Sequence, residues 1–194
     1  DIINSTTNNV FIPITVGGGI RSIDDVTSAL NSGADKVSIN TAAIKNPSLI
    51  TQISEKFGSQ CMVLSIQAKS KNGAWEAYYD NGRESSGLDV VEWAKKGQDL
   101  GAGEILLTSV DREGTAKGMD IELIKAVTAV VTLPVIASGG VGNLNDIGLA
   151  VEEGGADAIS IAHVLHYEEL TINEIRQYCI EKKIPVRRLS EDGA

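Results

Sequence analysis

The stretch IPITVGGGI at residues 12–20 has a close counterpart far along the chain, LPVIASGGV at residues 133–141. Each is a short apolar run that begins near a proline and ends in adjacent glycines, which predicts a buried strand followed by a tight turn. A second pair follows, with GADKVSI at 33–39 and GADAISI at 155–161. A strand–glycine–helix–strand unit that occurs twice predicts a duplicated α/β architecture.

The two glycine turns also predict binding sites for anions. Backbone N–H groups that face outward at the start of a helix bind phosphate, because they donate hydrogen bonds and lie at the positive end of the helix dipole. Two such turns in one duplicated domain predict a ligand with a phosphate group at each end.

The rest of the chain alternates short β-branched runs with longer runs of helical period. We expect six strands, at 12–17, 36–40, 61–66, 104–109, 134–138 and 157–161. We expect helices after them, at 22–31, 47–57, 89–99, 120–131, 143–153 and 171–182. The stretch 68–87 interrupts this order, because the turn dipeptides Asn72-Gly73 and Asn81-Gly82 flank an alternating apolar segment and predict an inserted hairpin.

Strands that alternate with helices form parallel sheets with right-handed crossovers, in either a doubly wound sheet or a (β/α) barrel. Glycine and polar residues follow nearly every strand, which favours a TIM-type barrel with its ligands at the carboxyl-end rim. A closed barrel of this type has eight strands. We therefore expect residues 1–194 to form a single α/β domain, a partial (β/α) barrel that lacks about the first two β/α units.

Composition excludes several classes of function. A net charge of −9 argues against nucleic acid as the main partner. No apolar run approaches the ~18–20 residues of a membrane span, and no basic-then-apolar leader is present, so we expect a cytoplasmic protein. Cys61 and Cys179 stand far apart without His or Cys neighbours, which predicts reduced core thiols rather than a disulfide or a metal site.

The motifs VGGGI (16–20), GADKVSINTAA (33–43) and NPSLI (46–50) resemble the HisF family, the cyclase subunit of imidazole glycerol phosphate synthase. GAGEILLTS (101–109) and IASGG (136–140) extend the resemblance along the chain. It implies a barrel of two half-barrels, in agreement with the internal repeat. It also implies a bisphosphorylated ribulosyl substrate of histidine biosynthesis, ammonia from a HisH-type glutaminase, and no metal or redox cofactor.

The resemblance assigns residues to two phosphate sites. The first phosphate site would consist of Gly19, Asn40 and Thr41. Thr108 would be a separate polar contact at the end of another strand. The second phosphate site would consist of Gly114, Gly139, Gly140, Ala162 and His163. The alternative is structural: the glycines would serve only their turns, Asn40 would cap a helix, and His163, where the family usually has Ser, would be a packing or surface residue.

The chain departs from the family at the catalytic positions. The resemblance implies two aspartates as general acid and base, on the first and fifth barrel strands, and the first would precede this chain. The second position holds Gln67, whose carboxamide is isosteric with a carboxylate but cannot exchange a proton near neutral pH. Glu113 stands where the family commonly has Asp and carries the same charge one methylene further out.

Three functions remain open at this point. The chain could be part of a working cyclase, a divergent relative that binds a bisphosphorylated sugar or ribonucleotide, or a non-catalytic remnant that assembles with another chain. A different ammonia-using pathway, such as sugar amidation, is an alternative to the second. We favour ligand binding with catalysis impaired or lost, because of Gln67. Two open sheet edges predict a homo-oligomer that completes the barrel.

Overall fold

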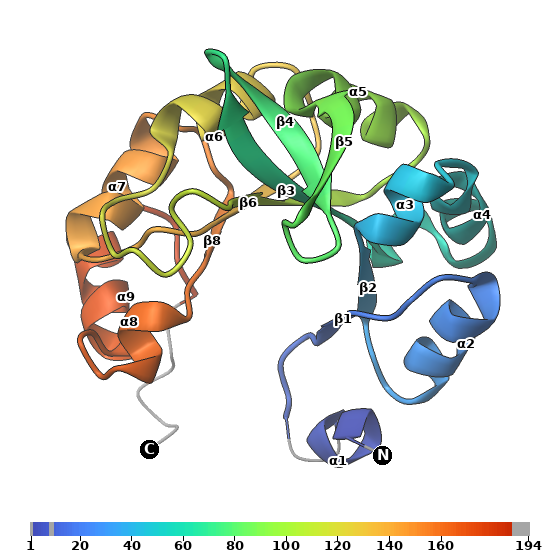
Figure 1. Ribbon diagram of the computed structural model, residues 1–194. Helices are drawn as coiled ribbons and strands as arrows, with labels where there is room; N and C mark the ends of the chain where they lie inside the picture. Colours follow the sequence, from blue (N-terminus) through green and yellow to red (C-terminus); the bar gives the residue numbers. More distant parts are fainter. Residues whose placement is uncertain (1, 8–9, 188–194) are drawn as a thin grey trace.

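The computed structural model describes residues 2–7 and 10–187. Six parallel strands lie in the order β1-β2-β3-β6-β7-β8. Their bounds are β1 Thr15–Gly17, β2 Lys36–Ile39, β3 Met62–Lys71, β6 Glu104–Ser109, β7 Val135–Ser138 and β8 Ala158–Ser160. Figure 1 shows the strands curled into an arc with the helices on its outer side. The predicted fold is therefore confirmed: an α/β half-barrel of six parallel strands, consistent with a partial TIM barrel.

The helices that follow the strands agree with the predicted ranges to within a few residues. They are α2 Ile23–Asn31, α4 Ser48–Phe57, α5 Val90–Asp99, α6 Ile121–Thr128, α7 Leu144–Glu152 and α9 Ile172–Glu181. Helix α6 ends before the predicted residue 131, because the β-branched run 130–132 and the proline that follows disfavour helix. The predicted ranges do not include the short helices α1 Ile2–Thr7, α3 Thr41–Lys45, α8 His163–His166 and the 3-10 helix η1 Ser59–Cys61. A helix after Asn40 is expected only in the structural alternative for that residue.

The two helices that follow the glycine turns begin in the same way. Ser22 accepts a hydrogen bond from the backbone of Asp25, and Asp25 accepts one from the backbone of Ser22, which makes a capping box. Asn143 and Asp146 repeat this arrangement at α7. The backbone hydrogen bond from Arg21, and then the bonds from Ser22, lower the pKa of Asp25. The duplication thus extends from the strands to the caps.

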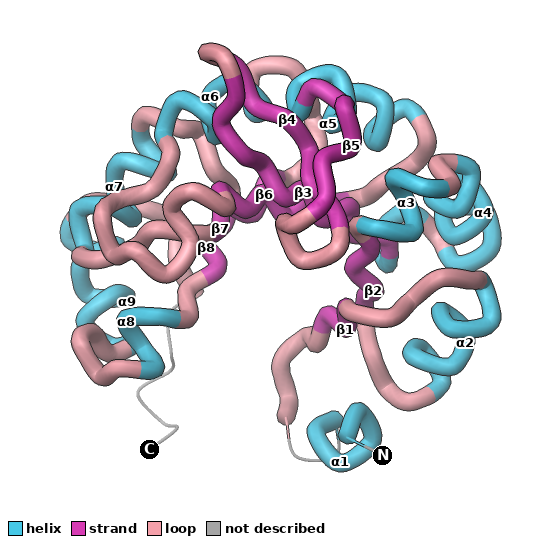
Figure 2. Tube along the Cα trace, viewed as in Figure 1, coloured by secondary structure: helices cyan, strands magenta, loops and turns pink. Residues whose placement is uncertain are grey.

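A hairpin extends the sheet beyond the end of β2. Strand β2 pairs with β3 over Met62–Leu64, and β4 Ala74–Tyr79 pairs antiparallel with the same edge of β3 over Gln67–Lys71. Strand β5 Glu84–Asp89 completes the hairpin, which lies at the middle of the arc beside β3 in Figure 2. Because β4 runs back along β3, the β4–β5 turn returns to the carboxyl end of β2. The predicted hairpin is confirmed, on a β3 strand longer than predicted.

A buried carboxylate fastens the hairpin internally. Glu76 on β4 is 6% exposed and accepts hydrogen bonds from Lys71 Nζ, Ser85 Oγ and the backbone of Gly87. These three donors, Lys71 foremost, lower the pKa of Glu76 to about 2. The bonds span both turns of the hairpin, so Glu76 sets how β4 and β5 lie on each other, next to the register shift between Glu76 and Tyr78.

The hydrophobic core lies between the sheet and the helices. Strand residues such as Val37, Leu64 and Ile105 are fully buried, as are Trp93 and Ile50 on the helices. Cys61 and Cys179 are buried free thiols, as predicted, and burial raises the pKa of both. The alternate strand residues face the concave side of the arc, because successive side chains of a strand point to opposite faces.

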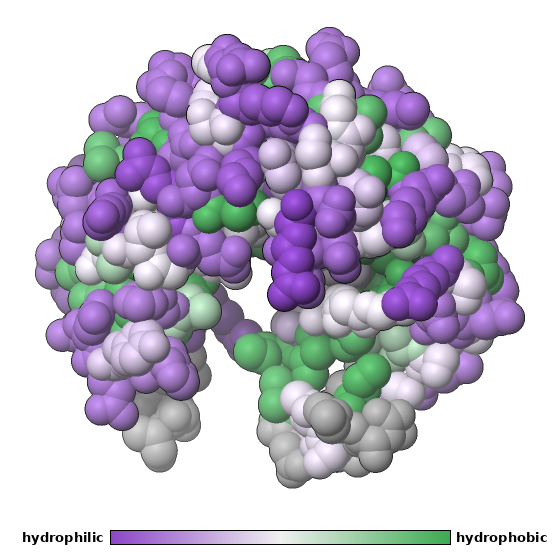
Figure 3. All heavy atoms as spheres, viewed as in Figure 1, coloured by the Kyte–Doolittle hydropathy of each residue, from purple (hydrophilic) through white to green (hydrophobic). Residues whose placement is uncertain are grey.

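The two ends of the arc are open. Strand β1 pairs only with β2 and β8 only with β7 among the described residues, so each presents an unpaired edge. Phe11 and Ile12, just before β1, are 94% and 60% exposed. Figure 3 shows an opening between the two ends, with hydrophobic residues on the β1 side. Within the described ranges, no helix is long and apolar enough to cross a membrane.

Candidate functional site

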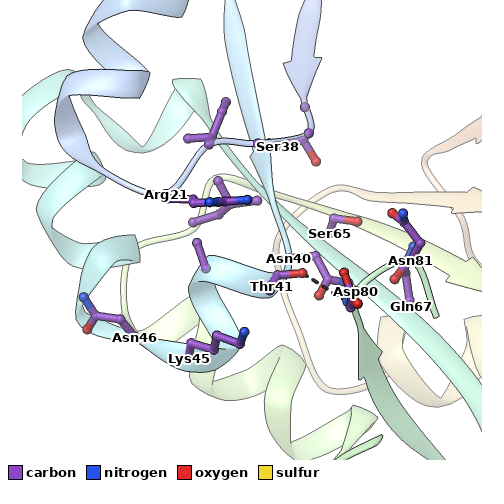
Figure 4. Close-up of a pocket in the computed structure, with 16 residues that line it drawn as sticks. Arg21, Ser38, Asn40, Thr41, Lys45, Asn46, Ser65, Gln67, Asp80 and Asn81 are labelled. Atoms are coloured by element: carbon purple, nitrogen blue, oxygen red, sulfur yellow. Dashed lines mark hydrogen bonds between the residues drawn. The ribbon is translucent and has the colours of Figure 1, made fainter. Parts of the chain in front are cut away.

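Two cavities lie at the carboxyl-end rim of the arc. The first cavity has a volume of about 860 Å³ and opens among the turn after β1, the end of β2 with α3, the floor of β3 and the β4–β5 turn. Figure 4 shows its polar side chains converging from these elements. Its lining consists of Gly17, Gly18, Gly19, Ile20, Arg21, Ser38, Ile39, Asn40, Thr41, Ala42, Lys45, Asn46, Ser65, Gln67, Asp80 and Asn81.

All three residues predicted for the first phosphate site, Gly19, Asn40 and Thr41, line the first cavity. Gly18 and Gly19 have φ angles of +89° and +78°, which side chains rarely adopt. A β-carbon built at either would meet no atom within 4 Å. These two glycines are therefore required by the turn, and they leave the backbone open toward the cavity.

Asn40 and Thr41 serve different purposes. The Asn40 side chain donates from Nδ2 to the carbonyl of Tyr78 at 3.1 Å and makes no capping bond to α3. Its Oδ1 is buried without a hydrogen-bond partner. Thr41 Oγ1 accepts from the backbone N–H of Asp80 at 3.1 Å, which leaves its own proton to donate. The Thr41 hydroxyl thus suits an oxyanion better than the Asn40 side chain does.

The structure adds three charged side chains that sequence reasoning missed. Arg21 and Lys45 line the first cavity, and Asp80 is the only carboxylate among its described lining residues. Lys45 Nζ lies 5.3 Å from the centre of the Tyr79 ring on the hairpin. The sequence did contain a signal for the two cations. Arg21 follows the glycine turn almost directly, and Lys45 lies one helical turn after Thr41, so both are spaced to reach a ligand at that turn. No local sequence pattern predicts that Asp80 lies at the first cavity.

The second cavity is smaller, about 80 Å³, and lies where β7 and β8 end. All five residues predicted for the second phosphate site line it, together with Glu113. Its complete lining is Glu113, Gly114, Ala116, Ser138, Gly139, Gly140, Val141, Ser160, Ile161, Ala162 and His163. The half-buried His163 ring lies 4.7 Å from the ring of Tyr167.

The glycines of the second cavity are packed, unlike those of the first. A β-carbon at Gly140 would lie 2.3 Å from the carbonyl oxygen of Gly118, and one at Gly139 would lie 2.8 Å from that of Ser109. The loop after β6 therefore needs both residues to be glycine, whether or not a ligand binds. Gly114, with φ +69°, faces open space. It alone among the three combines a left-handed turn with an open surface.

A band of uncharged polar residues joins the two cavities across the concave face. Gln67 pairs in register with Thr108, Thr108 with Ser138, and Ser138 with Ser160. Thr108 is 8% exposed and lies within this band rather than in either cavity. Such side chains can hydrogen-bond the hydroxyl groups of a sugar but cannot transfer protons near neutral pH. Gln67 and Glu113 open into different cavities, so they do not form an acid–base pair.

Within residues 2–7 and 10–187, no three His, Cys, Asp or Glu side chains are grouped as a metal site would require. The fold is an α/β half-barrel consistent with a partial TIM barrel, and its two rim cavities lie at the carboxyl ends of the strands, where TIM barrels have their active sites. The family model described as histidine biosynthesis protein matches residues 1–171, so the chain belongs to this family. The predicted resemblance is thereby confirmed for the histidine biosynthesis family as a whole, and the match names no particular member of it.

Proposed function

We propose that the chain is a HisF-type member of the family that binds a bisphosphorylated sugar or ribonucleotide, with one phosphate group in each rim cavity. The observation that carries this proposal is the pair of cavities beside the two duplicated glycine turns, joined by a band of uncharged polar side chains. The open backbone at Gly18 and Gly19 and the free proton of Thr41 supply donors in the first cavity. Gly114 and His163 would supply them in the second.

The same geometry argues that ordinary cyclase turnover is impaired or lost. Gln67 occupies the floor of the first cavity, where the resemblance implies a catalytic aspartate. The loss of a general acid or base typically lowers a rate by 10²–10⁴-fold. Glu113 cannot compensate from the second cavity, because it lies beyond the band of Thr108 and Ser138. The protein would then hold the ligand without converting it at the rate of a HisF enzyme.

The test combines a binding and a turnover measurement. The bisphosphorylated ribulosyl substrate is titrated by calorimetry, and its consumption is then followed with excess ammonium salt, beside an active HisF enzyme. We expect saturable binding and a rate at least about 100-fold below that of the active enzyme. Equal rates would refute the loss of catalysis, whereas absence of binding would refute the proposed ligand.

We further propose that a second copy of the chain completes the open arc. The unpaired edges of β1 and β8, and the exposed Phe11 and Ile12 beside β1, support this assembly. An unpaired sheet edge presents a row of free N–H and C=O groups that another strand can pair with. Sedimentation at micromolar concentration should show a dimer or a larger oligomer. A single monomeric species would contradict it.

A further inference from the structure

The first cavity is positively charged in a protein with an excess of acidic residues. The chain has a net charge of −9, yet this cavity contains Arg21, Lys45 and a single carboxylate, Asp80. The ion pairs in the described part of the chain lie elsewhere, at Lys36–Glu104, Lys71–Glu76 and Lys95–Glu92. Lys45 forms no ion pair with a carboxylate of the described residues, so its charge is available to an anionic ligand. Arg21 also attracts the Asp25 carboxylate, whose pKa it helps to lower, and still lines the cavity beside the glycine turn.

The hairpin holds Lys45 in place. Lys45 Nζ lies over the Tyr79 ring at 5.3 Å, a cation–π contact. Tyr79 is itself fixed from both sides, because the carbonyl of Tyr78 accepts from Asn40 and the N–H of Asp80 donates to Thr41. Lys45 also follows Thr41 by one helical turn, so both residues lie on the same side of α3. The hairpin thus positions the lysine on the side of the cavity that presents the Thr41 hydroxyl (Figure 4).

We infer that Lys45, positioned by Tyr79, is a ligand-binding residue of the first cavity and that with Arg21 it selects a doubly charged phosphate monoester over a singly charged diester. This inference rests on the proposed function, which puts a phosphate group in this cavity. The two cations, one in the turn after β1 and one on α3, balance two negative charges. The planar guanidinium binds two oxygens, and the ammonium acts as a point charge on the third. A diester has lost one charge and one free oxygen, so it uses only part of this set.

The test uses ribose 5-phosphate and its methyl ester, which differ by one methyl group and one charge. A monoester phosphate has a second pKa of about 6, so ribose 5-phosphate is a dianion at pH 8. The titrations are followed at pH 8 through the amide NMR signals of Gly19 and Thr41, which report on the first cavity alone. We expect the wild-type chain to bind the monoester about 10-fold more tightly than the diester.

The variant Lys45→Gln should weaken monoester binding about 10-fold and diester binding much less, because the lost bond is to a charged group. Lys117→Gln is the matched control, since Lys117 is an exposed lysine that lines a separate hollow after β6. It should bind both ligands as the wild type does. Tyr79→Leu should lose part of the preference, and the double variant should bind no more weakly than Lys45→Gln alone. That pattern identifies Tyr79 as a positioning residue that acts through Lys45.

Each outcome decides between the two proposals. If Lys45→Gln binds the monoester as tightly as the wild type, or loses equal affinity for both ligands, the inference about Lys45 is wrong. If Lys45→Gln still binds the monoester in that case, the cavity binds phosphate without Lys45 and the proposed function survives, and weaker binding by Arg21→Gln would then assign the phosphate contact to Arg21. If the wild type shifts neither amide signal, both the inference and the first phosphate site are rejected.

Discussion

Gly19 and Gly140 occupy equivalent positions in the two copies of the repeat, and substitution by alanine should affect them very differently. Both have positive φ angles, +78° at Gly19 and +102° at Gly140. Alanine in either place has the same chemistry and the same backbone strain to a first approximation. The surroundings differ, because Gly19 faces open space and Gly140 packs on the loop after β6. The pair is therefore an internal control for the effect of packing.

The expected magnitudes follow from these surroundings. Left-handed backbone costs an L-residue roughly 1–2 kcal/mol, which applies to both variants. At Gly140 the added β-carbon would also lie 2.3 Å from Gly118 O and 2.9 Å from Gly118 C, both backbone atoms. Overpacking of this kind adds about 1–3 kcal/mol. We expect Gly19→Ala to lower the free energy of unfolding by about 1 kcal/mol and Gly140→Ala by about 3 kcal/mol.

Urea unfolding followed by circular dichroism measures both values. In a chain of this length about 1 kcal/mol corresponds to a change of roughly 2–4 °C in Tm, so thermal unfolding should separate the variants as well. Gly19→Ala should in addition weaken ribose 5-phosphate binding, because its methyl group would occupy the first cavity. Equal destabilisation by the two variants would refute the packing difference between the glycine turns.

Three further predictions concern the hairpin and its contacts. The pKa of Glu76 is about 2 in the folded protein against an ordinary 4.5, so its ionised form stabilises the fold fully above pH 4.5 and this is lost as pH falls toward 2. Glu76→Gln should flatten acid unfolding over that range, measured by circular dichroism, and a curve parallel to the wild type would be the contrary result. Asp80→Asn, which tolerates the φ of +51°, should strengthen ribose 5-phosphate binding about 2–5-fold by removing a like charge, and weaker binding would contradict this. Thr41→Val should speed hydrogen exchange of the Asp80 amide at least about 10-fold, since that N–H loses its acceptor, and an unchanged rate would mean that the turn is held otherwise.

The sequence predicts those strands and helices that are long enough to show a hydrophobic period. The strands are short β-branched runs and the major helices carry both period and caps, so Ser22 marked the start of α2 correctly. Helices α3 and α8 have five and four residues, too few to display a helical period. The residues expected near the two glycine turns do line two cavities. They come together because parallel strands place all their carboxyl ends on one rim.

The rest depends on contacts between distant segments. Asp80 reaches the first cavity only because β2 and β4 share one edge of β3, and no local pattern encodes that arrangement. Gly19 and Gly140 look alike in sequence, yet what distinguishes them is Gly118, on a loop far from Gly19. The sequence predicts Asn40 as a phosphate ligand, and only the fold shows that its amide donates to the carbonyl of Tyr78, a residue of the hairpin. Side-chain partners of this kind become visible only with the fold.

The most direct test of the central claim is a titration of the chain with the bisphosphorylated ribulosyl substrate, followed by amide NMR. The amides of Gly19 and Thr41 report on the first cavity, and those of Gly114 and His163 report on the second. The account predicts that both pairs shift together and saturate at one equivalent of ligand, as one molecule with two phosphate groups requires. Shifts at only one cavity, or at neither, would contradict it.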